Sequence, residues 1–236
     1  MPRTASNVPK CLVSALASTR FSTRPTLTNR SDNFRRNYDR PMPEIELRWL
    51  TEADDQRRAE IHTVVHDVVA AGGAVGYHEP PTFERISQWL DDILKQVRDG
   101  NAAFATAVVD GVVQAVGLWR RGSTAVFQHR AEIQQIMAHP AARGLGLGKR
   151  VVQGLVEHAR ENGIEIVMLG TRGNNHGAIE LYESLGFREC GRMPNAIAVG
   201  NERWDDVWMY LPLGYPAGTV LNGAKAGGLG SSPRRS

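Results

Sequence analysis

Apolar and polar residues alternate along Glu44–Leu50, with Ile45, Leu47 and Trp49 on one side. This period of two predicts a strand that buries one face. From there to Arg98, apolar positions recur every three or four residues, which predicts two amphipathic helices. Their buried stripes are expected to comprise Ile61, Val64, Val65, Val68 and Val69 in the first and Phe83, Ile86, Leu90, Ile93 and Val97 in the second.

Turn and cap residues mark the boundaries of these helices. We expect Thr51 to cap the first helix, which ends at Gly72-Gly73, and the second helix to open after Pro80-Pro81. The strongest turn signal is Asp110-Gly111, which lies between two apolar, β-prone segments and predicts a hairpin.

The rest of the middle region alternates between strands and helices. Further strands are expected near 130–138, 164–169, 187–193 and 207–211, and further helices after Gly146 and from His176 to Leu185. The order β-α-α-β-β-β-α-β-α-β-β predicts an α/β fold. Its sheet is mixed, mostly antiparallel and about seven strands wide, with helices on both faces.

Charge is distributed unevenly over the 236 residues, whose formal net charge is +3. Residues 1–41 carry eight Lys/Arg and two Asp/Glu, and residues 215–236 carry three Lys/Arg and no acid. The remaining middle holds 17 Lys/Arg against 23 Asp/Glu. An acidic folded part attracts amines and repels phosphate backbones, so we expect no nucleic-acid partner. No apolar run approaches the roughly 20 residues that cross a bilayer, so we expect no membrane partner either.

The composition predicts one folded domain, 42–213, between two flanks. Residues 1–41 are Ser-, Thr-, Asn- and Arg-rich and are expected to form a disordered basic extension; a targeting segment, a solvated tail and a start codon assigned too early stay open as interpretations. Residues 214–236 are Gly/Ser-rich and are expected to be a flexible tail. Cys11 and Cys190 lie far apart, which favours a reducing, cytoplasmic location without disulfides or a metal site.

The first segment with candidate chemistry is the Gly-rich turn between the strand at 130–138 and the following helix. The N–H groups that open a helix bind phosphate oxygens, and glycines let a ligand approach the backbone. Arg143, Lys149 and Arg150 add positive charge for a polyanion. The glycine spacing does not fit the dinucleotide fingerprint, and Arg150 stands where a P-loop needs Ser or Thr.

The second segment runs from Asn175 to Phe187. Asn175 occupies a helix N-cap position, and Tyr182 follows two helical turns later on the same face. A single tyrosine on a helix is more often a packing residue. Tyr182 becomes a candidate functional residue only because its segment follows the Gly-rich turn at the right distance in the chain.

Together the two segments resemble the GNAT superfamily of acetyltransferases. The family signature R/Q-x-x-G-x-G/A matches Arg143–Gly148, and the signature N-x-x-A-x-x-x-Y-x-x-x-G-F matches Asn175–Phe187. The resemblance covers most of Met42–Leu213. It implies a β-bulge that splays the central strands, and acetyl-CoA, inserted in the gap, as cosubstrate without a metal.

The resemblance also implies roles for individual residues. Backbone groups at Met137 and Ala138 would hold the pantetheine arm, the Asn175 side chain would touch the cofactor, and Tyr182 would protonate the departing thiolate. The pyrophosphate would lie against the amides of the loop, with Lys149 beside it. The loop residues expected there are Arg143, Gly144, Leu145, Gly146, Leu147 and Gly148.

A narrower resemblance involves Gly72–Tyr77 and Arg130–Met137, which look like the tabtoxin-resistance acetyltransferases, enzymes that acetylate a small amine toxin. Glu132 also matches the glutamate base of the histone-acetylating branch. The toxin-resistance enzymes carry an acidic residue on the next strand, where this chain has Gly170. The second carboxylate and the exact substrate therefore do not carry over.

The acceptor end adds further candidates. An ammonium must lose a proton before it attacks a thioester, so we expect Glu132 to be the base; the alternative is a structural role paired with Arg120, Arg121 or Arg130. A strand amide near Met137 or Ala138 would hold the oxyanion.

Four further residues are candidates for substrate binding. Tyr77 and Glu79 lie in the loop that shapes the acceptor pocket in this family. Asp205 and Asp206 either attract a cationic substrate or form a solvated turn. His62 and His66 have metal-ligand spacing, but Thr63 replaces the base of the H-E-x-x-H motif, so we interpret them as an exposed helix face.

These observations predict an acyltransferase of EC class 2.3.1 that acetylates a primary amine of a small molecule, as a monomer or homodimer. A protein N-terminal or lysine acetyltransferase and a non-catalytic acyl-CoA sensor stay open as alternatives. The segment Pro194–Asn201 and the loop Tyr77–Pro81 are expected to close the site, which favours a small substrate over a peptide.

Overall fold

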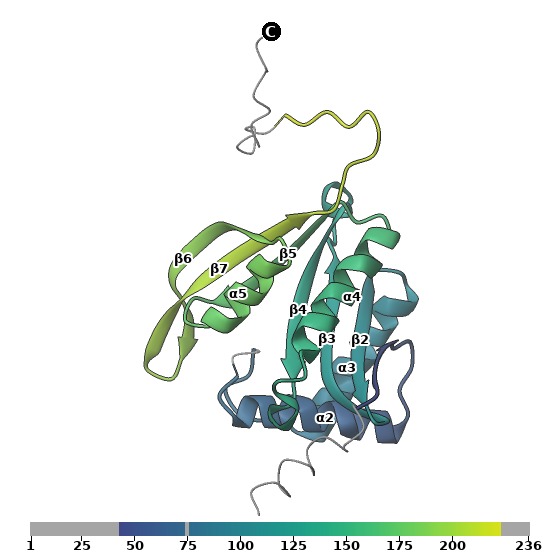
Figure 1. Cartoon of the computed structure of the whole chain (residues 1–236), viewed down its shortest axis with the longest axis vertical. Helices are drawn as coiled ribbons and strands as arrows, with labels where there is room; N and C mark the ends of the chain where they lie inside the picture. Colours follow the sequence, from purple (N-terminus) through teal and green to yellow (C-terminus); the bar gives the residue numbers. More distant parts are fainter. Residues whose placement is uncertain (1–42, 74–75, 223–236) are drawn as a thin grey trace, which may run out of the picture. The chain divides into compact units, whose positions relative to one another are not determined.

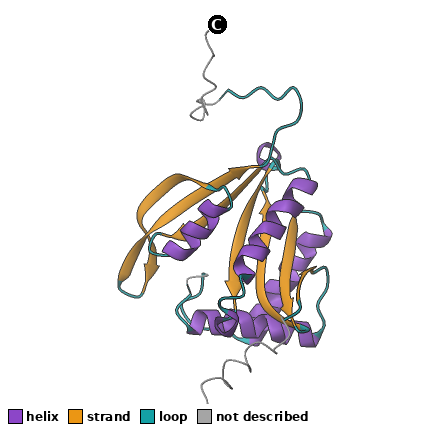
Figure 2. Cartoon of the chain, in the orientation of Figure 1, coloured by secondary structure: helices purple, strands orange, loops and turns teal. Residues whose placement is uncertain are grey.

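The computed structural model describes residues 43–73 and 76–222, which form a seven-stranded sheet with helices on both faces (Figures 1 and 2). The expected extension 1–41 and most of the expected tail lie outside these residues. The elements are β1 (Ile45–Trp49), α2 (Asp55–Ala70), α3 (Phe83–Arg98), β2 (Ala102–Val109), β3 (Val112–Arg121), η1 (Ala125–Phe127), β4 (Arg130–Ala138), η2 (Pro140–Ala142), α4 (Leu147–Glu161), β5 (Ile166–Arg172), α5 (His176–Ser184), β6 (Arg188–Val199) and β7 (Glu202–Pro212).

The sheet has the strand order β1-β2-β3-β4-β5-β7-β6. All neighbouring strands are antiparallel except β4 and β5, which are parallel. The mixed, mostly antiparallel sheet that the sequence predicts is therefore confirmed. A parallel pair needs a crossover connection, and α4 provides it between β4 and β5.

Two hydrophobic clusters hold the helices against the sheet. One joins α4 and α5 to one face, with Val151, Leu155 and Tyr182 among its buried members. The other joins α2 and α3 to the opposite face, with Ile61 and Leu90 fully buried. The expected helical stripes thus do form the core, because each is the apolar side of a helix that packs on a sheet.

Three predicted features are wrong in detail. The N-cap of α2 is Asp54 and not Thr51: the Asp54 carboxylate accepts a hydrogen bond from Arg57 N at 2.8 Å. Phe83 is 38% exposed and not buried, because it is the first residue of α3 and its ring contacts His62 at the end of the helix pair. The strand expected at 187–193 continues to Val199, so Pro194–Asn201 belongs to the β6–β7 hairpin.

Candidate functional site

The parallel strands β4 and β5 pair over only four residues each, Arg130–Ile133 with Ile166–Leu169. Beyond Ile133, β4 pairs only with β3, and beyond Leu169, β5 pairs only with β7. A cavity of about 900 Å³ occupies this gap. Its walls are Val68, Val69, Gly72, Gly73, Gly76, Tyr77, His78 and Glu79 from α2 and its loop, Glu132–Ala138 from β4, Leu169–Arg172 from β5, Asn175, Tyr182, Ile197–Gly200, Asp206 and Trp208.

A β-bulge in β4 accompanies the divergence of the strands. The register with β3 shifts between Val116 and Leu118, and Gln135 adopts a φ of 51°, a conformation that few residues other than glycine take. Gly117 lies opposite, where an added Cβ would come within 2.5 Å of Ile136 Cδ1 and 2.6 Å of Val151 Cγ1. The bulge therefore depends on the missing side chain of Gly117. It re-aims the backbone at Met137, which lies past the last contact with β5.

The Gly-rich turn after β4 opens α4 as the sequence predicts. Gly144 and Gly146 have φ values of 86° and 69°, and Gly146 is the N-cap. The first helical hydrogen bond runs from Arg150 N to Gly146 O at 3.1 Å, so the N–H groups of Leu147 and Gly148 have no partner inside the helix. Such an array of N–H groups at the positive end of a helix dipole suits a phosphate group.

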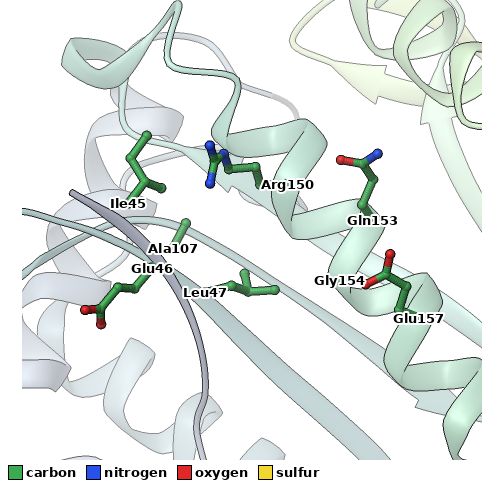
Figure 3. A pocket seen from close by; sticks show the side chains of 8 residues that line it. All are labelled: Ile45, Glu46, Leu47, Ala107, Arg150, Gln153, Gly154 and Glu157. Carbon is green, nitrogen blue, oxygen red and sulfur yellow. The ribbon is translucent and has the colours of Figure 1, made fainter. Parts of the chain in front are cut away.

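The three cationic residues of this turn do not lie together. Arg143 and Lys149 are exposed beside the open N–H groups. Arg150 lines a separate hollow of about 250 Å³ between β1 and α4, with Glu46 and Glu157 among its walls (Figure 3). The expectation that all three cations face one polyanion is therefore not supported for Arg150.

Asn175 and Tyr182 both line the cavity from α5. Asn175 is the N-cap residue as expected, but its side chain makes no capping hydrogen bond, which leaves its amide for a ligand. Tyr182 is 8% exposed and its ring lies 6.0 Å from that of Phe187. Burial raises the pKa of Tyr182 to about 12, because the phenolate would be poorly solvated there. The phenol consequently keeps its proton at neutral pH.

Glu132 is half-buried in the cavity wall at the point where β4 and β5 begin to diverge. Arg120 is its partner across β3–β4, yet no ion pair within 4.0 Å joins Glu132 to any cation of the described residues. Arg121 instead donates to backbone carbonyls, and Arg130 lies 3.8 Å above the ring of Phe127. The carboxylate therefore lines the cavity without an ion pair to a cation of the described residues.

Tyr77 and Glu79 line the cavity from the loop after α2, as the sequence predicts. Burial raises the pKa of Tyr77, and the nearby Arg85 guanidinium only partly opposes this effect. The two aspartates named as candidates lie on different faces of β7. Asp205 lies outside the cavity, where its carboxylate accepts hydrogen bonds from Arg192 and from Asn195 N. Asp206 lines the cavity, because successive strand residues point to opposite faces.

Arg172 and Trp208 are cavity residues that were not predicted as binding residues. Arg172 lies beyond residue 169, where its strand was expected to end, and Trp208 lies in an expected strand but belongs to no motif. Ile197–Gly200, part of the segment Pro194–Asn201 that was expected to close the site, lines the cavity from the β6–β7 hairpin. At Gly170, the expected site of a missing carboxylate, an added Cβ would lie 3.4 Å from Asp206 Oδ1. The carboxylate of Asp206 thus lies in the space beside Gly170. This proximity depends on the β5–β7 register, so no sequence motif predicts it.

The two histidines on α2 each contact a protein acceptor. His62 donates to Pro81 O at 3.0 Å, and His66 contacts the Asp67 carboxylate at 2.8 Å. Asp67 also contacts His139, and these two hydrogen bonds lower the pKa of its carboxyl. Over residues 43–73 and 76–222, no group of three or more His, Cys, Asp or Glu side chains is arranged to hold a metal, and no helix is long and apolar enough to cross a membrane.

Comparison with known sequences finds a match to one family over part of the chain. The model of the acetyltransferase (GNAT) family matches residues 74–187, which include the bulge, the Gly-rich turn and α5. A mycothiol acetyltransferase of Renibacterium salmoninarum is 29% identical over 65% of this chain and 41% of that protein. An L-methionine sulfoximine/L-methionine sulfone acetyltransferase of Salmonella typhimurium is 35% identical over 41% of this chain and 55% of that protein. The chain thus spans about half the length of these curated relatives.

Solved structures share the fold. A GNAT superfamily phosphinothricin acetyltransferase from Sinorhizobium meliloti, solved in complex with AcCoA, is 21% identical with a TM-score of 0.63. The match covers 77% of this chain and 96% of that one. This chain therefore shares with that structure its fold, the mixed sheet with helices on both faces.

Proposed function

We propose that this chain, whose residues 74–187 match the acetyltransferase (GNAT) family, is an acetyltransferase that transfers an acetyl group from acetyl-CoA to the amine of a small molecule. The observation that carries the proposal is the cavity between β4 and β5, because its walls combine a strand bulge, a carboxylate and a protonated phenol. The phosphate-suited turn opens α4 immediately after β4.

The described residues fit acetyl-CoA. The free N–H groups from Gly146 to Lys149, with Arg143 and Lys149 beside them, suit its pyrophosphate. Past the bulge, the β4 edge at Met137 and Ala138 lacks a β5 partner, so its backbone groups can hold an amide-containing arm. The uncapped amide of Asn175 offers one further contact.

Each catalytic step has a residue in the cavity wall. Glu132, directly or through one water, takes the proton that an alkylammonium must lose before its nitrogen attacks a thioester. A backbone N–H near Met137 or Ala138 stabilises the oxyanion of the tetrahedral intermediate. Tyr182, protonated because its pKa is raised, donates its hydrogen bond to the departing thiolate.

The enclosure of the cavity favours a small acceptor. Tyr77 and Glu79 stand on one side, and Ile197–Gly200 from the β6–β7 hairpin closes another. A protein N-terminal or lysine acetyltransferase needs an open groove for a peptide, and an acyl-CoA sensor does not need Glu132 and Tyr182 together. The relatives named for small amine-bearing compounds add weight to the small-molecule assignment.

The experiment is an acetylation assay with purified protein, acetyl-CoA and matched libraries of small amines and peptides. We expect turnover of small amines, and a Glu132→Gln variant should be slowed most at low pH, where the ammonium fraction is highest. Glu161→Gln, at the far end of α4, is the charge-matched control and should behave as wild type. Exclusive turnover of peptides would replace the small-molecule assignment, and acetyl-CoA binding without any turnover would favour the sensor.

A further inference from the structure

Arg172, the last residue of β5, is a cation of the cavity wall without a counterion. It is half-buried, its Nε is fully buried, and that Nε has no hydrogen-bond partner. No described carboxylate lies within the 4.0 Å of an ion pair with it. An arginine that lines a cavity without an ion pair is suited to an anionic group that enters the cavity.

The neighbours of Arg172 contact the guanidinium without an ion pair. Asp206 is its cross-strand partner on β7, but no ion pair within 4.0 Å joins the two, and the Asp206 carboxylate accepts a hydrogen bond from Trp208 Nε1 at 2.8 Å. The ring of Trp204 lies 5.9 Å from the guanidinium carbon, within the range of a cation–π contact. An aromatic ring holds an arginine in place while its N–H groups stay available.

Arg172 lies on the face of the sheet opposite the Gly-rich turn, so the phosphates of the cofactor are not its expected partner. Leu169 and Val207 belong to the cluster under α4 and α5, so Arg172, which is an odd number of residues from Leu169, points to the opposite face. The Gly-rich turn opens α4 on the Leu169 side. Arg172 therefore meets the ligand that enters from the α2 side, which under the proposed function is the acceptor.

The strand register places Arg172 at the height of the proposed chemistry. Glu132 pairs with Met168, and Arg172 lies four residues beyond Met168. On β4, four residues beyond Glu132 lead to Ile136, at the bulge. Because β4 and β5 are parallel, Arg172 lies beyond Glu132 in the direction of the bulge and on the other side of the gap, where the extra residue of the bulge shortens the rise of β4. A molecule whose amine lies near Glu132 and the bulge would extend its adjacent atoms towards β5.

We propose that Arg172 binds an acidic group next to the acceptor amine, so that the acceptor is an amino acid or a close analogue. The assignment rests on the proposed function. Arginine binds carboxylates through two parallel N–H···O bonds, which fixes orientation as well as charge. Glu132 would then receive the proton of the amine while Arg172 holds the acid. The pocket thus selects zwitterionic acceptors over simple amines.

The test compares α-amino acids with their α-carboxamides, using L-methionine sulfone, L-methionine and L-phenylalanine as acids. Wild type should show a kcat/KM at least about tenfold higher for the preferred acid than for its carboxamide. The comparison is stringent, because removing the carboxylate charge lowers the pKa of the amine and by itself favours the carboxamide. Arg172→Gln should reduce kcat/KM for the acid at least tenfold and change that for the carboxamide less than about threefold.

Arg188→Gln on β6 is the charge-matched control, since Arg188 is exposed and lies outside the cavity; it should retain both activities. Two results would overturn the role of Arg172 and leave the proposed acetyltransferase activity standing. One is an equal kcat/KM of wild type for acids and carboxamides, and the other is an equal loss of kcat/KM for both substrates in Arg172→Gln. If Arg172→Gln does not fold, the wild-type comparison and Arg172→Lys, which keeps charge but loses the two-point geometry, decide instead. Absence of turnover with every amine overturns both proposals together.

Discussion

Replacing Tyr182 by Phe removes one buried hydroxyl and keeps the ring that packs against Phe187. With a pKa of about 12, the phenol is a weaker acid than a thiol, whose pKa is about 8.5. Complete proton transfer to a free thiolate would therefore cost roughly 5 kcal/mol. The main contribution expected from Tyr182 is a hydrogen bond to the developing thiolate, worth about 1.5–3 kcal/mol.

This energy corresponds to a loss of roughly 10- to 150-fold in kcat for Tyr182→Phe. The assay is steady-state release of free thiol with the best acceptor, beside calorimetric titration with acetyl-CoA, whose affinity should change less than about threefold. Tyr215→Phe, on an exposed residue, is the matched control. Wild-type turnover by a folded Tyr182→Phe with normal affinity would refute the assigned role of the hydroxyl.

The same residue predicts how stability depends on alkaline pH. Because the folded-state pKa of Tyr182 is raised from 10.0 to about 12, the contribution of the neutral phenol is fully present below pH 10 and is lost as pH rises towards 12. We expect urea midpoints of wild type to fall over this window and those of Tyr182→Phe to fall less. Equal slopes for both proteins would show that the phenol is not desolvated.

The remaining predictions concern the cofactor turn, the bulge and the domain boundaries. Gly146→Asp should weaken acetyl-CoA binding at least tenfold by calorimetry, a loss of about 1.4 kcal/mol or more, because a carboxylate would face the pyrophosphate; Gly100→Asp, with a similar φ of 72° at a distant turn, should leave the affinity unchanged. Gly117→Ala should destabilise the fold by about 1–3 kcal/mol in urea unfolding through overlap with Ile136 and Val151, whereas Gly177→Ala, with open space around it, should not. A chain trimmed to residues 42–213 should bind acetyl-CoA as the full chain does, and a large fall in melting temperature would show that a flank packs on the domain.

Local patterns were sufficient for most of the fold. The turn at Asp110-Gly111 has positive φ at both positions, 48° and 86°, which few dipeptides adopt as readily, and the hairpin around it forms as predicted. Gly146 opens α4 for the same reason, since its left-handed conformation favours glycine. Predictions were less accurate where two signals competed, as at Thr51 and Asp54, since either residue type can cap a helix and only the path of the chain selects one.

The sequence by itself determined the helical stripes, the order of elements and the phosphate-suited turn, because each depends on residues close together in the chain. Glu132 and Tyr182 were chosen through the family resemblance, and their roles stay predictions. Only the tertiary structure decided that Asp205 lies outside the cavity while Asp206 and Arg172 line it. That outcome depends on the register between β5 and β7. A shift of this register by one residue would exchange the side chains that face the cavity for those that face away from it. It depends equally on the divergence of β4 from β5, a long-range feature that opens one face of Arg172 to a ligand and leaves no periodic trace in the sequence.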